Sequence, residues 1–72
     1  MPRCLQLALI FALVSQLAFA EDTAKARDAF LKGQALYTSK KFKDALAKFE
    51  ESYAAKPHPA TTYNIARCQD QL

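Results

Sequence analysis

Apolar residues recur every three or four positions after residue 22, and this spacing limits the fold more than any other feature of the chain. The first such stripe consists of Ala26, Ala29, Phe30, Gly33, Leu36 and Tyr37, and charged side chains fall outside it. This spacing places apolar side chains on one face of an α-helix, whereas a half-buried strand alternates every second residue. The stripe predicts a helix over about 23–38, with Asp22 or Thr23 as its N-cap.

Two more helices are expected downstream. A second stripe, over about 42–56, consists of Phe42, Ala45, Leu46, Phe49, Ser52 and Tyr53. Pro57 ends this helix because proline lacks an amide hydrogen and disfavours helical geometry in the preceding residue. Pro59 suits the first position of a third helix over 59–72, whose apolar residues are Tyr63, Ile65, Ala66, Cys68 and Leu72. The predicted fold is all-α: an antiparallel helix hairpin with a turn at 39–41, followed by one more helix.

Residues 1–20 have the three parts of a helical secretory signal peptide. Arg3 supplies the positive start, residues 5–14 are apolar except for Gln6, and Ala18-Phe19-Ala20 is a small–x–small cleavage motif. The apolar run is shorter than the roughly 20 residues that span a bilayer. We therefore expect cleavage after Ala20, no stable membrane span afterwards, and export to the periplasm or the extracellular space.

Export implies an oxidising compartment, which makes the cysteines informative. Cys4 lies in the leader, so the expected mature chain, residues 21–72, keeps Cys68 alone. It cannot form an intramolecular disulfide. Two interpretations stay open for Cys68: a small buried helix residue, or a thiol that pairs between chains.

A repeated spacing links the first and third expected helices. Phe30 and Tyr63 each precede a small residue by three positions, Gly33 and Ala66, and the two pairs are 33 residues apart. Small residues at these places let a neighbouring helix pass close. With Tyr37, Phe42, Ala45, Phe49, Ser52 and Pro57 in the corresponding roles, the chain resembles the tetratricopeptide repeat, and in particular exported bacterial proteins with such repeats. The resemblance implies a first repeat over 24–57 and the start of a second over 59–72.

The resemblance also implies a binding surface. In this family the concave face is built mainly by the first helix of each repeat, which implies a partner-binding face of Arg27, Phe30, Gln34, Tyr37, Asn64 and Arg67. A partner's helix or extended segment would lie on this face, with Arg27, Gln34, Asn64 and Arg67 setting its polarity.

The same architecture leaves the third helix short of a neighbour. Repeats of this kind gain stability by stacking, and about three are normally needed. We expect the flank of the third helix, led by Tyr63, Ile65 and Leu72, to be covered by a further repeat, a second copy or a partner protein.

No catalytic, cofactor or metal site is predicted. His58 is the sole histidine and lies between two prolines, and a single glycine rules out a Gly-rich phosphate loop. The ten Lys and Arg residues include Arg3, so nine remain after residue 20 against seven Asp and Glu, too even a balance for a nucleic-acid binder. The sequence favours a non-catalytic protein–protein interaction module. The alternatives are a self-associating structural helical protein, joined through the third helix, and an N-terminal docking fragment of a longer repeat protein.

Overall fold

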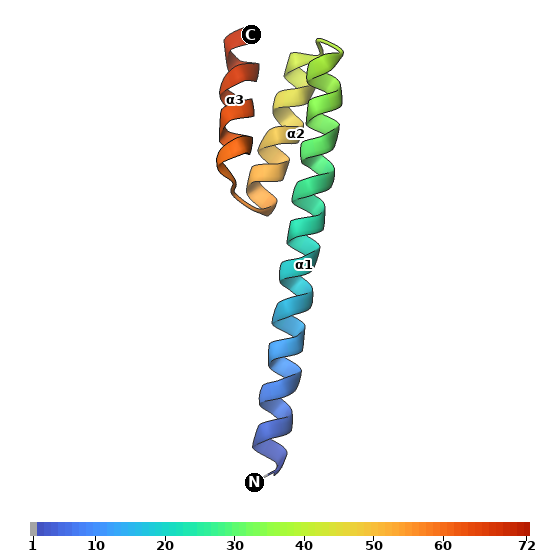
Figure 1. Ribbon diagram of the computed structural model, residues 1–72, viewed down its shortest axis with the longest axis vertical. Helices are drawn as coiled ribbons and strands as arrows, with labels where there is room; N and C mark the ends of the chain where they lie inside the picture. Colours follow the sequence, from blue (N-terminus) through green and yellow to red (C-terminus); the bar gives the residue numbers. More distant parts are fainter. Residues whose placement is uncertain (1) are drawn as a thin grey trace.

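The computed structural model describes the backbone of residues 2–72 and the side chains of residues 20–72. It has three helices: α1 (Pro2–Thr38), α2 (Phe42–Ala55) and α3 (Pro59–Gln71). No strand occurs over residues 2–72, so the all-α prediction is confirmed. In Figure 1, α2 runs back along the C-terminal half of α1, and α3 lies along the other side of α2.

The start of the first helix differs from the expectation. The backbone is helical through Asp22 and Thr23, so neither residue is an N-cap in this structure, and that prediction is wrong. Nothing in the sequence interrupts helical geometry there, because no Gly or Pro lies between residues 3 and 32. The predicted signal peptide falls almost wholly outside the residues with described side chains, and its cleavage stays a prediction.

A tight turn joins α1 to α2, where the sequence predicted one. Lys40 has φ of 62°, the left-handed conformation that commonly follows the end of a helix. The Lys41 amide donates to the Leu36 carbonyl and the Lys40 amide to the Tyr37 carbonyl, both at 2.9 Å. These two bonds form a Schellman motif, which satisfies carbonyls that the helix end leaves without partners. The motif reverses the chain and sets α2 antiparallel to α1.

The hairpin core is centred on Phe49, which is 1% exposed. Its ring packs on the backbone at Gly33: a Cβ added there would lie 2.8 Å from Phe49 Cε1. Phe30 meets the same ring edge-on, with centroids 5.5 Å apart. Ala29 and Ala45 complete the close approach at 3% and 0% exposure. A small residue at position 33 is therefore required, as the sequence predicted.

A second bend separates α2 from α3. Lys56 is extended (φ −156°, ψ 111°), the geometry that Pro57 favours in its predecessor. His58 is the N-cap of α3: its Nδ1 accepts a hydrogen bond of 3.1 Å from the Ala60 amide, and Pro59 occupies the first helical turn. Both prolines therefore act as the sequence predicted, and the histidine has a local structural role.

The predicted stripes are confirmed in α1 and mostly in α2, and less well in α3. All six members of the first stripe are buried or half-buried, but Tyr53 of the second is 44% exposed. In α3, Cys68 is fully buried and Ile65 is half-buried against the core. The prediction that Ile65 belongs to the uncovered flank is therefore wrong. Tyr63 and Leu72 are 65% and 69% exposed.

Candidate partner-binding face

Four of the six predicted binding residues lie along one side of α1. Arg27, Phe30, Gln34 and Tyr37 are separated by three, four and three positions, the spacing that keeps side chains on one helix face. Arg27 and Gln34 are exposed, whereas Phe30 and Tyr37 are half-buried because they also pack on the core. The structure divides this face into two groups, one near each end of α3.

The first group brings α1 and α3 together through Arg67. Its guanidinium carbon lies 4.4 Å from the centroid of the Tyr37 ring and 5.6 Å from that of Tyr63. A cation over an aromatic face is attracted by the ring quadrupole. Tyr37 is itself held by an edge-on contact with Phe42, with centroids 5.1 Å apart. Two predicted binding residues, Tyr37 and Arg67, are therefore in direct contact.

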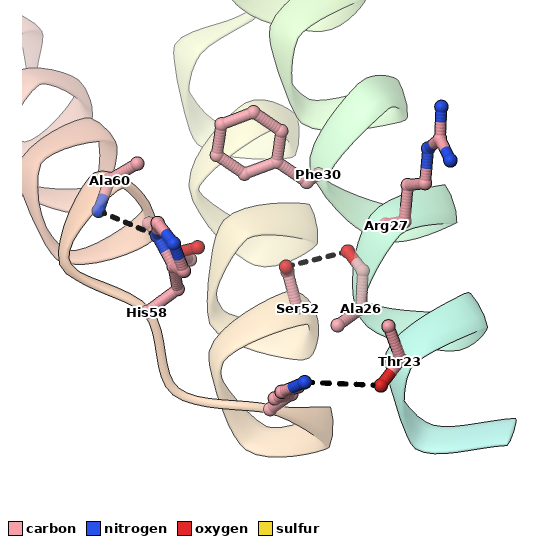
Figure 2. Close-up of a pocket in the computed structure, with 9 residues that line it drawn as sticks. Thr23, Ala26, Arg27, Phe30, Ser52, His58 and Ala60 are labelled. Atoms are coloured by element: carbon pink, nitrogen blue, oxygen red, sulfur yellow. Dashed lines mark hydrogen bonds between the residues drawn. The ribbon is translucent and has the colours of Figure 1, made fainter. Parts of the chain in front are cut away.

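The second group lines a pocket of about 320 Å³ near the bend between α2 and α3. Figure 2 shows Arg27 on the α1 side of this pocket and His58 and Ala60 on the α3 side, with Ser52 of α2 between them. Nine residues line it: Thr23, Ala26, Arg27, Phe30, Ser52, Lys56, His58, Ala60 and Thr61. The pocket is thus built by all three helices and the bend, and none of its lining residues is acidic.

Two hydrogen bonds fix the base of the pocket. Ser52 Oγ donates to the Ala26 carbonyl at 2.7 Å, and both residues are buried. Lys56 Nζ donates to Thr23 Oγ1 at 3.2 Å. One bond starts from α2 and the other from the residue after it, and both end on α1, as the dashed lines in Figure 2 show. They join the two sides of the pocket.

Gln34 and Asn64 belong to neither group. Gln34 is exposed on α1, where its backbone carbonyl accepts a 3.0 Å hydrogen bond from Thr38 Oγ1, and Asn64 is half-buried on α3. Sequence reasoning did not predict that Ser52, Lys56 and His58 line a pocket beside the candidate face. The available signal was the small, polar Ser52 within an otherwise apolar stripe.

Cys68 is fully buried in the core between α2 and α3. Burial raises the pKa of its thiol, and the nearby Arg67 charge opposes this only in part. A disulfide between two chains needs an accessible sulfur. Of the two interpretations of this cysteine, the structure therefore favours the small buried helix residue.

The described residues were also compared with the requirements of a metal site and of a membrane span. Over residues 20–72, no three His, Cys, Asp or Glu side chains come together as metal ligands would. In the part of the chain that was described, no helix has both the length and the apolar character of a membrane span.

Comparisons with known proteins do not assign the chain to a family. The sequence matches no protein-family model, and neither the curated proteins nor the solved structures contain a match.

Proposed function

We propose that this protein is a non-catalytic interaction module of tetratricopeptide type that binds a segment of a partner protein on the α1–α3 face. The observation that carries the proposal is that the Arg67–Tyr37–Tyr63 contact and the open pocket, near opposite ends of α3, are both built by residues of α1 and α3. Together they give one face of the molecule an amphipathic surface made from two helices that are far apart in sequence. Arg and Tyr, together with Trp, are the residue types enriched among those that dominate the binding energy of protein interfaces.

The face suits an extended or helical segment better than a small molecule. Its pocket has the volume of the smallest ligand sites, which range over roughly 300–1,000 Å³. Beyond the pocket, the surface continues along α1 past the exposed Gln34 to Tyr37. A polypeptide segment would use both groups at once.

We also propose that the module acts outside the cytoplasm, after cleavage of residues 1–20. The basis is the order of Arg3, the apolar run and Ala18-Phe19-Ala20 in the sequence. N-terminal sequencing of protein recovered from an exporting host would return Glu21 as the first residue. A chain that retains Met1 in the membrane fraction would contradict the export proposal.

Site-specific photocrosslinking tests the binding proposal. A photoreactive amino acid at Gln34, exposed on the face, is compared with one at Glu50, exposed on α2 and outside both groups. We expect a discrete adduct in the host envelope from position 34 and little from position 50, and the Tyr37→Ala variant should remove it. Equal adducts from both positions, or none from either, would contradict the proposal.

Self-association through α3 is the second candidate, favoured by the exposure of Tyr63 and Leu72. Because Cys68 is buried, such a dimer would be held by apolar contacts and not by a disulfide. Analytical ultracentrifugation with and without reductant is decisive for this candidate. It predicts a reductant-insensitive dimer that Tyr63→Ser weakens.

A further inference from the structure

We infer that the pocket at the α2–α3 bend binds a carboxylate next to an apolar side chain in a partner's extended segment. This inference rests on the proposed function and goes further by naming the chemistry of the partner. Its basis is twofold. The charged residues that line the pocket are all positive, and the interior of the pocket, where three helices meet, is apolar.

The rim is positively charged. Arg27 stands on the α1 side, and among the described residues it forms no ion pair. Lys56, directly after the end of α2, adds a second positive charge and also donates to Thr23. The acidic residues of the neighbourhood do not line the pocket, and Asp28 is paired with Lys32 at 3.0 Å. An incoming carboxylate would therefore meet complementary charge.

His58 adds a directed donor to this rim. Because its Nδ1 accepts from the Ala60 amide, the neutral ring carries its hydrogen on Nε2. The helix cap thus fixes both the tautomer and the orientation of the ring. A carboxylate oxygen accepts hydrogen bonds and an ammonium group does not, so this donor favours an acidic side chain over a cationic one.

The interior explains the apolar half of the ligand. Phe30, Ala26 and Ala60 present carbon to the pocket, and Figure 2 shows the Phe30 ring above the Ser52–Ala26 bond. The hydroxyl of Ser52 is already engaged with a carbonyl, so it does not need a ligand. Burying an apolar side chain here is favourable by about 25 cal/mol per Å² removed from water.

The spacing of the two groups predicts the length of the recognised segment. Arg27 and Tyr37 are ten residues apart on α1, about 15 Å at a rise of 1.5 Å per residue. An extended segment covers about 3.3 Å per residue, so about five residues reach from the pocket to Arg67 and its tyrosines. The ligand is thus a short extended segment with an apolar–acidic pair at one end.

Fluorescence anisotropy with two synthetic peptides tests the inference on the chain expressed from its full coding sequence. Both are eight residues long with leucine and serine at the same positions, and they differ in carrying glutamate or glutamine beside the leucines. We expect the glutamate peptide to bind at least about tenfold more tightly, the effect of one charge-assisted contact. Its affinity should fall as salt is raised, because exposed charges are screened.

Three variants locate the effect. Arg27→Gln should weaken the glutamate peptide about tenfold and leave the glutamine peptide unchanged. Lys43→Gln removes the same charge from an exposed position on α2 outside the pocket and should change neither. His58→Asn keeps an N-cap side chain but removes the ring donor, so it should reduce the preference for glutamate while circular dichroism stays unchanged.

The outcomes separate this inference from the proposed function. Equal binding of the two peptides, unaffected by Arg27→Gln but lost in Tyr37→Ala, would overturn the carboxylate pocket and leave the binding face standing. Binding of neither peptide, with capture of anionic phosphatidylglycerol vesicles that Arg27→Gln abolishes, would overturn both in favour of a lipid surface.

Discussion

The α1–α2 hairpin and α3 are built on different amounts of core. The hairpin has an aromatic pair, Phe30 and Phe49, packed over Gly33, with Ala29 and Ala45 buried beside them. In α3, the fully buried apolar side chain is Cys68, whereas Tyr63 and Leu72 are largely exposed. The hairpin is thus closed by its own side chains, and α3 has one covered flank and one open flank.

This difference identifies α3 as the helix whose stability a bound partner would change most. Local opening costs least where few apolar contacts are lost, so α3 should open before the hairpin does. A partner that covers Tyr63 and contacts Arg67 would stabilise α3 by mass action. Binding of a partner to α3 would then reduce the local opening of α3 itself.

Removing the Phe49 ring should break the contrast most strongly. Phe49→Ala leaves a cavity in the hairpin core, and such changes cost about 3–5 kcal/mol, enough to unfold a domain of this size. Loss of helical circular dichroism would report it. Leu31→Ala, at a position that is 54% exposed, is the matched control and should lower stability by less than about 1 kcal/mol. Equal effects would mean that the hairpin has no such core.

Filling the close approach at Gly33 is the next largest change. Gly33→Ala places a Cβ 2.8 Å from Phe49 Cε1, and overpacking costs about 1–3 kcal/mol. Alanine returns about 1 kcal/mol through its helix propensity, so a net loss of up to about 2 kcal/mol is expected in urea unfolding. Gln34→Ala, one residue along and exposed, should be neutral. A stabilised Gly33→Ala protein would contradict the close approach.

The buried hydroxyl of Ser52 should have an intermediate effect. Ser52→Ala removes the 2.7 Å bond to the Ala26 carbonyl, which costs about 1 kcal/mol. Thr38→Val removes an exposed hydroxyl that also donates to a helix carbonyl, and it should change stability far less. Chemical denaturation of both variants measures the difference, and identical values would show that the Ser52 bond does not join the helices.

The Arg67 contact with Tyr37 joins α3 to the hairpin directly, so its removal tests whether α3 is the less stable part. Arg67→Ala should remove about 0.5–1 kcal/mol, the range for an exposed cation–π contact. The loss should appear as faster amide hydrogen exchange in α3 and unchanged exchange in α2. A double-mutant cycle with Tyr37→Leu isolates the pair, and a coupling energy of zero would contradict the contact.

The smallest change near neutral pH concerns Cys68. Burial raises the pKa of the folded thiol above its ordinary value of 9.0, so at higher pH the unfolded chain loses its proton first. The unfolding free energy should therefore fall as pH rises above that value and through the folded pKa. Comparison of urea unfolding at pH 7 and pH 10 for the protein and its Cys68→Ala variant isolates this contribution. No difference in their pH dependence would contradict the buried thiol.

The sequence was most informative where local chemistry decides the conformation. Pro57 and Pro59 predicted the position of the second bend correctly, because the proline ring restricts the backbone dihedral angles of proline and of the residue before it. The stripe from Ala26 to Tyr37 gave the buried face of α1. It could not show that helix continues through Asp22 and Thr23, since capping side chains are also tolerated inside a helix.

The candidate face was predictable only in part. The family resemblance alone implied this face, and only Phe30 and Tyr37 of its residues also belong to the apolar stripe that periodicity gave. Periodicity did not separate Tyr53 and Tyr63, which are exposed, from Ile65, which is half-buried. Exposure depends on which neighbouring helix lies opposite, and that information is absent from a single helix's spacing.

Three helices and the bends between them followed from the sequence alone, because stripe spacing and proline geometry act within a few residues. The sequence also predicted a small residue at Gly33, but the reason for it, the Phe49 ring packed on its backbone, lies on another helix. The tertiary structure decided that Ser52 reaches the Ala26 carbonyl, that Arg67 covers Tyr37, and that His58 joins Arg27 at one pocket. These contacts join residues that are 26 to 31 positions apart in the chain. They exist because α2 packs between α1 and α3, and the physical reason is the burial of Phe49 and Cys68 on either side of it.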